Sequence, residues 1–180
     1  MGTKKSASPT YFKPAPSEIQ YGKMRYLITD RPTDLTIHQF IQELGKHNVR
    51  AVVRVCEPTY ATEPLRSAGI NVLDWEFNDG SPPPKEVIDK WLALSNTNFR
   101  DNPETCIAVH CVAGLGRAPV MVAIALMEAG MKYEDAVDLI RQNRRGAINQ
   151  KQLTFLEKYK SSGQLRKLKN GARHKDCCLM

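Results

Sequence analysis

The sequence predicts an α/β fold: one domain with a central, mostly parallel sheet of about five strands and helices on both faces of the sheet. Two observations predict this architecture. Short runs rich in β-branched residues alternate with segments of helical periodicity, which is typical of a parallel sheet covered by helices. The 180 residues also suffice to bury one core. We expect the domain to span residues 17–162, between an N-terminal extension (1–16) and a C-terminal tail (163–180).

The expected strands and helices follow from the spacing of apolar residues and from the glycines and prolines that interrupt them. Strands are expected over residues 19–29 (one or two strands broken near Gly22), 49–55, 70–75 and 106–110. Helices are expected over residues 35–47, 62–68, 84–99, 132–142 and 149–160, and in the apolar segment that follows Pro119. Proline is tolerated in a first helical turn, so Pro119 marks the start of that last helix. No internal repeat interrupts this alternation.

Composition narrows the class of protein. The chain has 26 lysine and arginine residues against 19 acidic ones, a net charge of +7. From Gln164 onward, five lysines and arginines face one aspartate, so much of the excess lies in the tail and favours an anionic surface as partner. No apolar run approaches the roughly 18 residues of a membrane span, and no signal-type segment precedes the domain. The five cysteines show no disulfide or metal-binding spacing, which favours a reducing, cytosolic setting.

One stretch organises the chain: Val109–Pro119, which contains His110, Cys111, Gly114 and Gly116. It joins an apolar strand to a helix through a glycine-bearing turn. Such a turn points successive backbone N–H groups at a ligand, and the helix dipole adds positive potential. Glycines allow close approach and backbone angles that a Cβ would forbid. The stretch therefore predicts an anion-binding site at the carboxyl end of the sheet.

Cys111 and Arg117 add chemistry to this cradle. The thiolate is the reactive form of cysteine, and a helix N-terminus favours it. Arg117, five intervening residues later, offers a planar fork of donors that fits two phosphoryl oxygens. A nucleophile below a phosphate clamp explains both residues; a buried cysteine beside an unrelated surface arginine is the alternative.

His110-Cys111-x5-Arg117 resembles the signature of cysteine-dependent protein tyrosine phosphatases, and the string from Cys111 to Pro119 is similar to the phosphatase of regenerating liver family. The similarity extends from about residue 21 to residue 180. It implies a dual-specificity type of phosphatase in which Cys111 takes the phosphoryl group as a phosphocysteine. It also implies that no metal or organic cofactor is needed. The phosphate would be held by Arg117 and by the loop residues Val112, Ala113, Gly114, Leu115 and Gly116.

A proton donor for the leaving group is expected in the loop that follows residue 75. The residues themselves leave Asp74 and Asp79 as candidates, with a solvated turn aspartate as the alternative. The resemblance implies Asp79 as the general acid, which would return as base for the attacking water. Glu76 and Asn78 depart from the family pattern, which usually has proline and aspartate there.

Ala118 and His110 are expected to tune the rate. Related signatures commonly place a serine or threonine after the arginine, whose hydroxyl stabilises the departing thiolate. Alanine has no donor, and loss of one such donor costs on the order of a hundredfold in rate. The family carries alanine here, so we expect a long-lived phosphocysteine and slow turnover. His110 is expected to tune Cys111 by hydrogen bonding, or else to cap the strand end.

The other cysteines have separate expectations. Cys56 follows a strand and should lie near the mouth of the site; the resemblance implies a reversible disulfide between Cys56 and Cys111 that silences the nucleophile. A buried inert thiol is the alternative for Cys56. Cys106, within a strand, is expected in the core. Three polar residues are expected at the rim of the site: Arg54, Glu57 and Gln150.

The chain ends in Cys177-Cys178-Leu179-Met180, a C-a-a-X box of the farnesyl type. One lipid chain anchors a protein only marginally, and the preceding basic cluster supplies the second signal, at about 1 kcal/mol per Lys or Arg. We therefore expect farnesyltransferase to modify Cys177 and the protein to lie on the cytoplasmic face of plasma and endosomal membranes. Unprenylated chain would be cytosolic or nuclear. The start, Met1-Gly2, also matches an N-myristoylation pattern, with an unmodified N-terminus as the favoured alternative.

The leading expectation is thus a membrane-associated cysteine phosphatase that acts on phosphorylated proteins, with phosphoinositides as a second substrate class. The rival is a binding module that uses the same pocket: the resemblance implies association with cyclin M magnesium transport mediators, and hence a role in magnesium homeostasis. The family also implies self-association into homo-oligomers. The basic tail lacks interleaved aromatic residues, so nucleic acid is not an expected partner.

Overall fold

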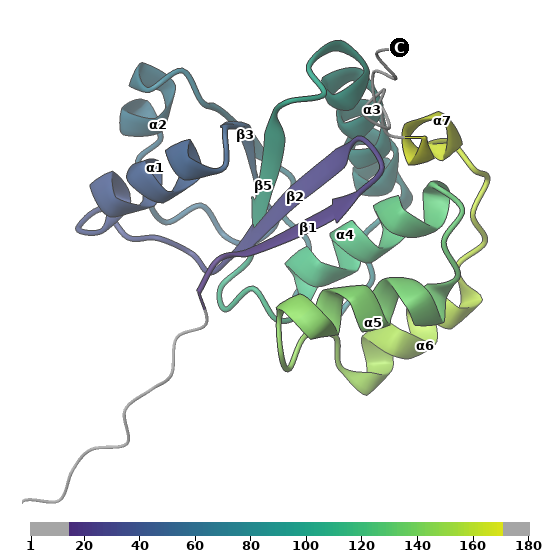
Figure 1. The fold of residues 1–180 in the computed structure, drawn as a ribbon. Coiled ribbons are helices and arrows are strands. Elements are labelled where there is room, and N and C mark those ends of the chain that lie inside the picture. Colours follow the sequence, from purple (N-terminus) through teal and green to yellow (C-terminus); the bar gives the residue numbers. More distant parts are fainter. Residues whose placement is uncertain (1–14, 171–180) are drawn as a thin grey trace, which may run out of the picture.

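The computed structural model describes residues 15–170. Its centre is a five-stranded sheet with the strand order β1-β2-β5-β3-β4 (Figure 1). The strands are β1 (Ser17–Tyr21), β2 (Met24–Thr29), β3 (Val49–Arg54), β4 (Asn71–Asp74) and β5 (Cys106–His110). β1 and β2 form an antiparallel hairpin, and every other pairing is parallel. The hairpin turns at Gly22, whose φ of 58° is a left-handed conformation that glycine adopts at little cost.

Helices cover both faces of the sheet. On one face lie α1 (Ile37–Lys46) and α2 (Glu63–Ser67), which pack on Leu27, Val52 and Ala108. On the other face lie α3 (Lys85–Asp101), α4 (Arg117–Glu128), α5 (Tyr133–Asn143) and α6 (Gln150–Lys158). A short α7 (Arg166–Lys169) follows. The predicted single α/β domain with a mostly parallel, doubly covered sheet is confirmed, and every expected strand and helix is present within a few residues of its expected bounds.

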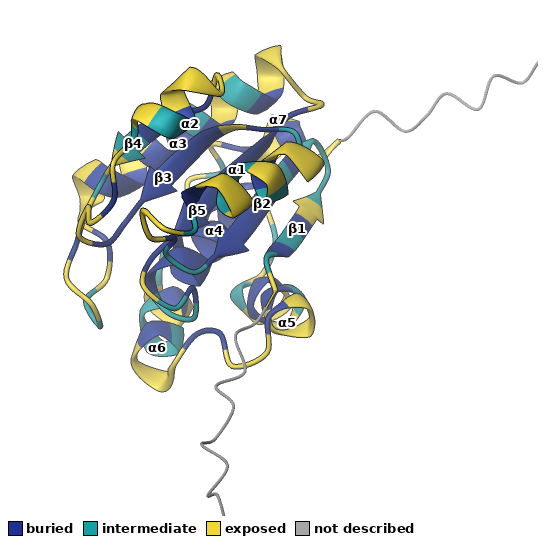
Figure 2. Cartoon of the chain, turned by 90° about the vertical axis from the view of Figure 1, so that its left-hand side faces the viewer, coloured by how far each residue is buried: buried dark blue, intermediate teal, exposed yellow. Residues whose placement is uncertain are grey.

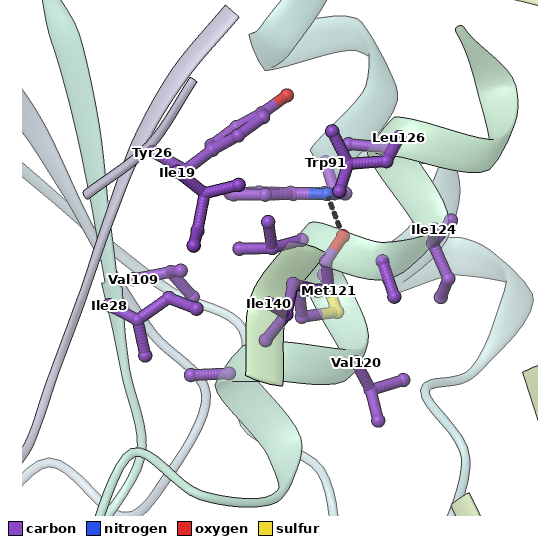
Figure 3. Close-up of a cluster of buried hydrophobic side chains, with 14 of the residues drawn as sticks. Ile19, Tyr26, Ile28, Trp91, Val109, Val120, Met121, Ile124, Leu126 and Ile140 are labelled. Atoms are coloured by element: carbon purple, nitrogen blue, oxygen red, sulfur yellow. Dashed lines mark hydrogen bonds between the residues drawn. The ribbon is translucent and has the colours of Figure 1, made fainter. Parts of the chain in front are cut away.

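The larger part of the core lies between the sheet and α4, which is buried along its whole length (Figure 2). The side chain of Trp91 spans from α3 to this helix: its indole N–H donates to the carbonyl oxygen of Met121 at 2.7 Å (Figure 3). The ring of Tyr26 stacks at 5.1 Å from Trp91, and its hydroxyl donates to Ser95 at 2.8 Å. Both aromatic polar groups are therefore satisfied inside the core, as buried Tyr and Trp require.

Glu128, the last residue of α4, is a buried carboxylate that fixes the chain after α6. It accepts hydrogen bonds from the Tyr159 hydroxyl at 2.7 Å and from the backbone N–H groups of Gln164 at 2.9 Å and Ser162 at 3.3 Å. Burial alone would raise the pKa of Glu128, but the hydrogen bonds from these residues together hold that pKa below its ordinary value. The carboxylate thus straps residues 159–164 to the helix that begins at the predicted site.

Packing continues beyond the domain boundary expected at residue 162, because Leu165 and Leu168 are buried in the core. The helix α7 was not expected from the sequence. It lies against the β1–β2 hairpin, where Lys23 N–H donates to the Leu168 carbonyl at 2.8 Å. Gly2 and Cys177 lie outside the described residues. Within residues 15–170, no helix is both long and apolar enough to cross a membrane.

Candidate active site

Cys111, the loop 112–116 and Arg117 lie at the carboxyl end of the sheet. Cys111 directly follows β5, the loop 111–116 returns to α4, and Arg117 is the first residue of that helix. A pocket of about 190 Å³ opens here. It is lined by Arg31, Glu57, Glu76, Phe77, Asn78, Asp79, Val112 and Arg117. A larger cavity of about 490 Å³ lies behind the loop, beside Leu115 and Arg144, and is lined by neither Arg117 nor Asp79.

The carbonyl groups of the phosphate loop (residues 111–116) are held from outside. Arg144 donates to the carbonyl oxygens of Ala113 at 3.1 Å and Gly114 at 2.6 Å. The N–H of Ile148 donates to the Leu115 carbonyl at 2.8 Å, and that of Arg31 to the Val112 carbonyl at 2.9 Å. In a planar trans peptide the N–H points opposite to the C=O. The amides of residues 113–116 are therefore turned away from these partners, as an anion-binding nest requires.

The two loop glycines are needed for different reasons. Gly114 has a φ of 69°, and a Cβ there would lie 2.4 Å from the carbonyl oxygen of Thr29 and 2.6 Å from the guanidinium of Arg144. Gly116 caps α4, and a Cβ there would lie 2.9 Å from the side-chain nitrogen of Gln152. A side chain at Gly114 would meet backbone and strain the chain, whereas one at Gly116 would have to displace the end of the Gln152 side chain.

Arg117 joins the phosphate loop to the loop that carries Asp79. Its terminal nitrogen Nη1 donates to the carbonyl oxygens of Phe77 at 3.1 Å and Val55 at 3.4 Å. Its Nε is buried and has no hydrogen-bond partner within the described residues, with Oδ1 of Asp79 at 3.7 Å. A buried guanidinium nitrogen without a partner favours an anion in the adjoining pocket.

The two candidate acids differ sharply. The side chain of Asp79 is 81% exposed and lines the pocket beside Arg117. Asp74 instead forms a bidentate ion pair with the buried Arg54, which also donates to the carbonyl of Tyr60. Of these two aspartates, Asp79 is the one that lines the pocket, where it could give a proton to a bound group.

His110 is buried among aromatic and sulfur atoms. Its Nδ1 lies 3.1 Å from the backbone carbonyl of Cys111, so this nitrogen carries the proton. Its Nε2 then accepts from the Tyr60 hydroxyl at 2.7 Å. Burial lowers the pKa of His110 to about 4, so the ring is neutral at pH 7. The expected hydrogen bond to Cys111 is thus made to its backbone carbonyl.

Cys56 and Cys111 are both buried and both free thiols in this structure. Cys56 lies beside the site, with its sulfur 3.8 Å from Nδ1 of His110. Burial raises the pKa of Cys56, the nearby Cys111 raises it further, and Arg117 opposes both. Cys106 lies in the core as expected, with its pKa raised to about 12 by burial.

The rim expectations are only partly met. Glu57 lines the pocket. The expectation for Arg54 is wrong: its side chain is buried and paired with Asp74, the residue opposite it where β3 pairs with β4. Gln150 is exposed at the start of α6 and does not line the pocket; its neighbour Gln152 contacts the loop side of Gly116.

Two arginines were missed by the sequence analysis. Arg31 follows the carboxyl end of β2, and that position alone could have marked it as a site residue. Arg144 lies 30 residues beyond the loop that it holds, in a basic segment that resembles a solvated surface. Within the described chain, no group of three or more His, Cys, Asp or Glu side chains is arranged to hold a metal ion.

Comparison with known proteins agrees with this geometry. The family model described as "Polymorphic toxin system, DSP-PTPase phosphatase" matches residues 29–131. The solved structure of a putative protein tyrosine phosphatase from Leishmania major covers 81% of this chain and 98% of its own, with a TM-score of 0.74 and 42% identity. Kinase associated phosphatase shares the fold at a TM-score of 0.63 and 17% identity, covering 87% of this chain and 97% of its own. The fold and the site define a cysteine-based protein tyrosine phosphatase.

Named relatives narrow the family. The chain is 56% identical to protein tyrosine phosphatase type IVA 3 of Bos taurus, across 93% of this chain and 97% of the relative. It is 58% identical to the PRL-1 phosphatase of Drosophila melanogaster, across 92% and 93% of the two chains. The chain therefore belongs to the type IVA, or PRL, family of protein tyrosine phosphatases, as the resemblance of its loop predicted.

Proposed function

We propose that this phosphatase works through a slowly hydrolysed phosphocysteine on Cys111 and acts at a membrane to which a farnesyl group on Cys177 attaches it. The observation that carries the catalytic part is the phosphate loop: its carbonyls are held from outside, and a buried Arg117 nitrogen without a hydrogen-bond partner adjoins the pocket. Donors fixed before substrate arrives stabilise developing charge most effectively.

The proposed reaction has two steps. The Cys111 thiolate attacks phosphorus, the bond to the leaving oxygen breaks, and Asp79 gives that oxygen its proton. Asp79 then takes a proton from water, the water oxygen attacks phosphorus, and the sulfur–phosphorus bond breaks to release phosphate and the thiolate. Arg117 and the loop amides hold the phosphoryl oxygens in both steps.

Slow hydrolysis of the intermediate is supported by Ala118, which is fully buried behind the loop and carries no hydroxyl for the departing thiolate. Intact-mass measurement after mixing with an aryl phosphate should show a phosphorylated chain that persists, and Cys111→Ser should abolish this adduct. Ala118→Ser should shorten the lifetime of the adduct by about tenfold or more, because a donor is restored. A chain that never becomes phosphorylated would overturn the proposal.

The membrane part rests on the sequence of the tail. A single prenyl chain binds reversibly, and the basic residues before Cys177 supply the second attraction to anionic lipid. In cells, Cys177→Ser should release the protein from membranes, and replacement of the tail lysines should weaken attachment in a salt-dependent way. Cys178→Ser is the matched control, because the a1 position of the box carries no lipid. Unchanged membrane binding of Cys177→Ser would contradict this part.

A reversible disulfide between Cys56 and Cys111 is proposed as a redox control. Its support is that both thiols are buried and free and that Cys111 is near enough to raise the pKa of Cys56. Mild oxidation should then block the labelling of Cys111 by a thiol reagent. In the Cys56→Ser variant the same treatment should leave Cys111 open to labelling, because no disulfide can form.

The second candidate function is docking of cyclin M-type magnesium transport mediators in the same pocket. It is favoured by the buried Arg117 nitrogen that has no hydrogen-bond partner, because this donor fits the carboxylate of a docked protein as well as a phosphate. Binding that needs Arg117 and is displaced by inorganic phosphate would support docking. The two functions are distinguished by the phosphocysteine, which docking alone does not require.

A further inference from the structure

We infer that the phosphatase prefers phosphorylated protein segments with basic residues beside the phosphorylated side chain, and that Glu57 and Glu76 at the pocket rim select them. This inference rests on the proposed phosphatase function and names the substrate class of that same site. The competing substrate class is a phosphoinositide headgroup in the membrane.

The first argument is the distribution of charge in the pocket. Three of its eight lining residues are carboxylates (Glu57, Glu76 and Asp79) and two are guanidinium groups (Arg31 and Arg117). Glu57 and Glu76 are exposed, and neither forms an ion pair within residues 15–170. A pocket that binds a dianion therefore has an acidic rim.

The buried positive charge of this pocket is that of Arg117, and Arg31 adds a partly exposed one to its lining. The Arg117 side chain is 9% exposed, and its Nε has no hydrogen-bond partner in the described part of the chain; its ion-pair partner, Asp79 Oδ1, lies 3.7 Å away. A phosphate bound there would neutralise the charges of Arg31 and Arg117 and leave Glu57 and Glu76 uncompensated. Basic side chains next to the phosphorylated residue would then be attracted, whereas acidic neighbours would be repelled. A phosphoinositide brings further phosphates and an anionic surface to this rim, and both are unfavourable.

The second argument is the position of the tail. β2 begins at Met24, beside α7, and ends at Thr29, two residues before the pocket residue Arg31. The helix α7 and the end of β2 that leads to Arg31 therefore lie at opposite ends of the sheet (Figure 1), separated by the length of a strand of roughly 17 to 20 Å.

The tail end of the molecule is suited to an anionic leaflet. Lys167 and Lys169 of α7 are exposed there, immediately before the basic tail. An anchor that binds the leaflet from this end leaves the pocket open on the side away from the bilayer. This placement favours phosphorylated protein segments over headgroups of the same bilayer as substrates.

The test compares two phosphotyrosine peptides that are identical except for two lysines or two glutamates beside the phosphotyrosine. The value of kcat/KM covers the steps up to phosphocysteine formation, so slow hydrolysis does not mask the comparison. At low salt the lysine peptide should be used about tenfold better, and the ratio should shrink at about 0.5 M salt. Binding of both peptides to the Cys111→Ser variant gives the same comparison without turnover.

Glu76→Gln should reduce the ratio to about threefold. Glu104→Gln, the same change on an exposed glutamate at the other end of the sheet, should leave the ratio unchanged. Equal use and equal binding of the two peptides, or no effect of Glu76→Gln, would overturn the inference while hydrolysis of an aryl phosphate still upholds the proposed function. Faster hydrolysis of a phosphoinositide in vesicles than of the lysine peptide would also overturn it. Absence of any phosphocysteine would instead count against the proposed function.

Discussion

The phosphate loop (residues 111–116) and the acid loop (residues 75–82) face each other across one pocket, yet they are built in opposite ways. Four successive carbonyls of the phosphate loop, from Val112 to Leu115, are fixed by donors behind it. The acid loop presents Asp79 mostly to solvent and meets Arg117, which follows the phosphate loop, through the carbonyl of Phe77 and through Asp79 Oδ1 at 3.7 Å from Nε.

This difference assigns rigidity and mobility to separate parts of the site. The anion cradle must be in place before the reaction, because donors that need no reorganisation stabilise charge best. The proton donor has to approach the leaving group and later water, and a loop with few bonds can move. Arg117 belongs to the rigid part, and its hydrogen bond to the Phe77 carbonyl connects it to the mobile acid loop. The following predictions separate the two regions.

Arg144→Met should have the largest effect, on both stability and catalysis. It removes a buried guanidinium and leaves the carbonyls of Ala113 and Gly114 without their donor. The free energy of unfolding should fall by about 3 kcal/mol. Because the loop amides lose their fixed direction, kcat/KM toward an aryl phosphate should fall by about a hundredfold.

Arg145→Met is the matched control, since this neighbouring arginine is exposed. Urea unfolding and steady-state kinetics on the two variants measure the contrast. A destabilised Arg144→Met with unchanged kcat/KM would show that the loop is not held in place from behind.

Asp79→Asn should reduce kcat/KM by about a hundredfold for an ester with a poor leaving group, and much less for one with a good leaving group. Its stability should change by less than about 0.5 kcal/mol, because the side chain is exposed. Asp74→Asn is the opposite case: it breaks the pair with Arg54 and should cost about 1 to 2 kcal/mol of stability without dependence on the leaving group. Equal leaving-group dependence of the two variants would contradict the assignment of the acid.

The smallest expected effect is a pH dependence that originates in the rigid region. His110 is kept neutral, with its pKa lowered to about 4 by burial. Below pH 6.5, the ordinary pKa of histidine, His110 binds a proton in the unfolded chain but stays neutral in the folded chain. The free energy of unfolding therefore falls as the pH drops from about 6.5 toward 4. The loss should reach about 1 to 2 kcal/mol at pH 5, measured by urea unfolding at several pH values. His110→Gln should flatten this slope, and an unchanged slope would place its origin elsewhere.

Sequence reasoning worked where the signal is local. The glycines, Cys111 and Arg117 lie within seven consecutive residues, so strand, turn and helix start could be read together. The alternation of valine-rich and amphipathic segments likewise predicted the layers of the fold. Both cases need only neighbours in the chain.

Sequence reasoning failed where contacts between residues distant in the chain determine the position of a side chain. Arg144 lies in a basic segment, and only the fold brings it behind the loop. Arg54 was expected at the rim, but its pairing with Asp74 depends on the register of two strands. The helix α7 has four residues, three of them basic, and is held by the burial of Leu168 rather than by its own propensity.

The strap on Glu128 has a practical consequence for shortened versions of this protein. A chain cut after Lys158 would leave that carboxylate inside the core without Tyr159, Ser162 and Gln164 as donors. An uncompensated buried charge of this kind costs several kcal/mol. Anyone who removes the lipid-bearing end for work in solution should therefore keep the chain through Leu168, or risk mistaking an unfolded catalyst for an inactive one.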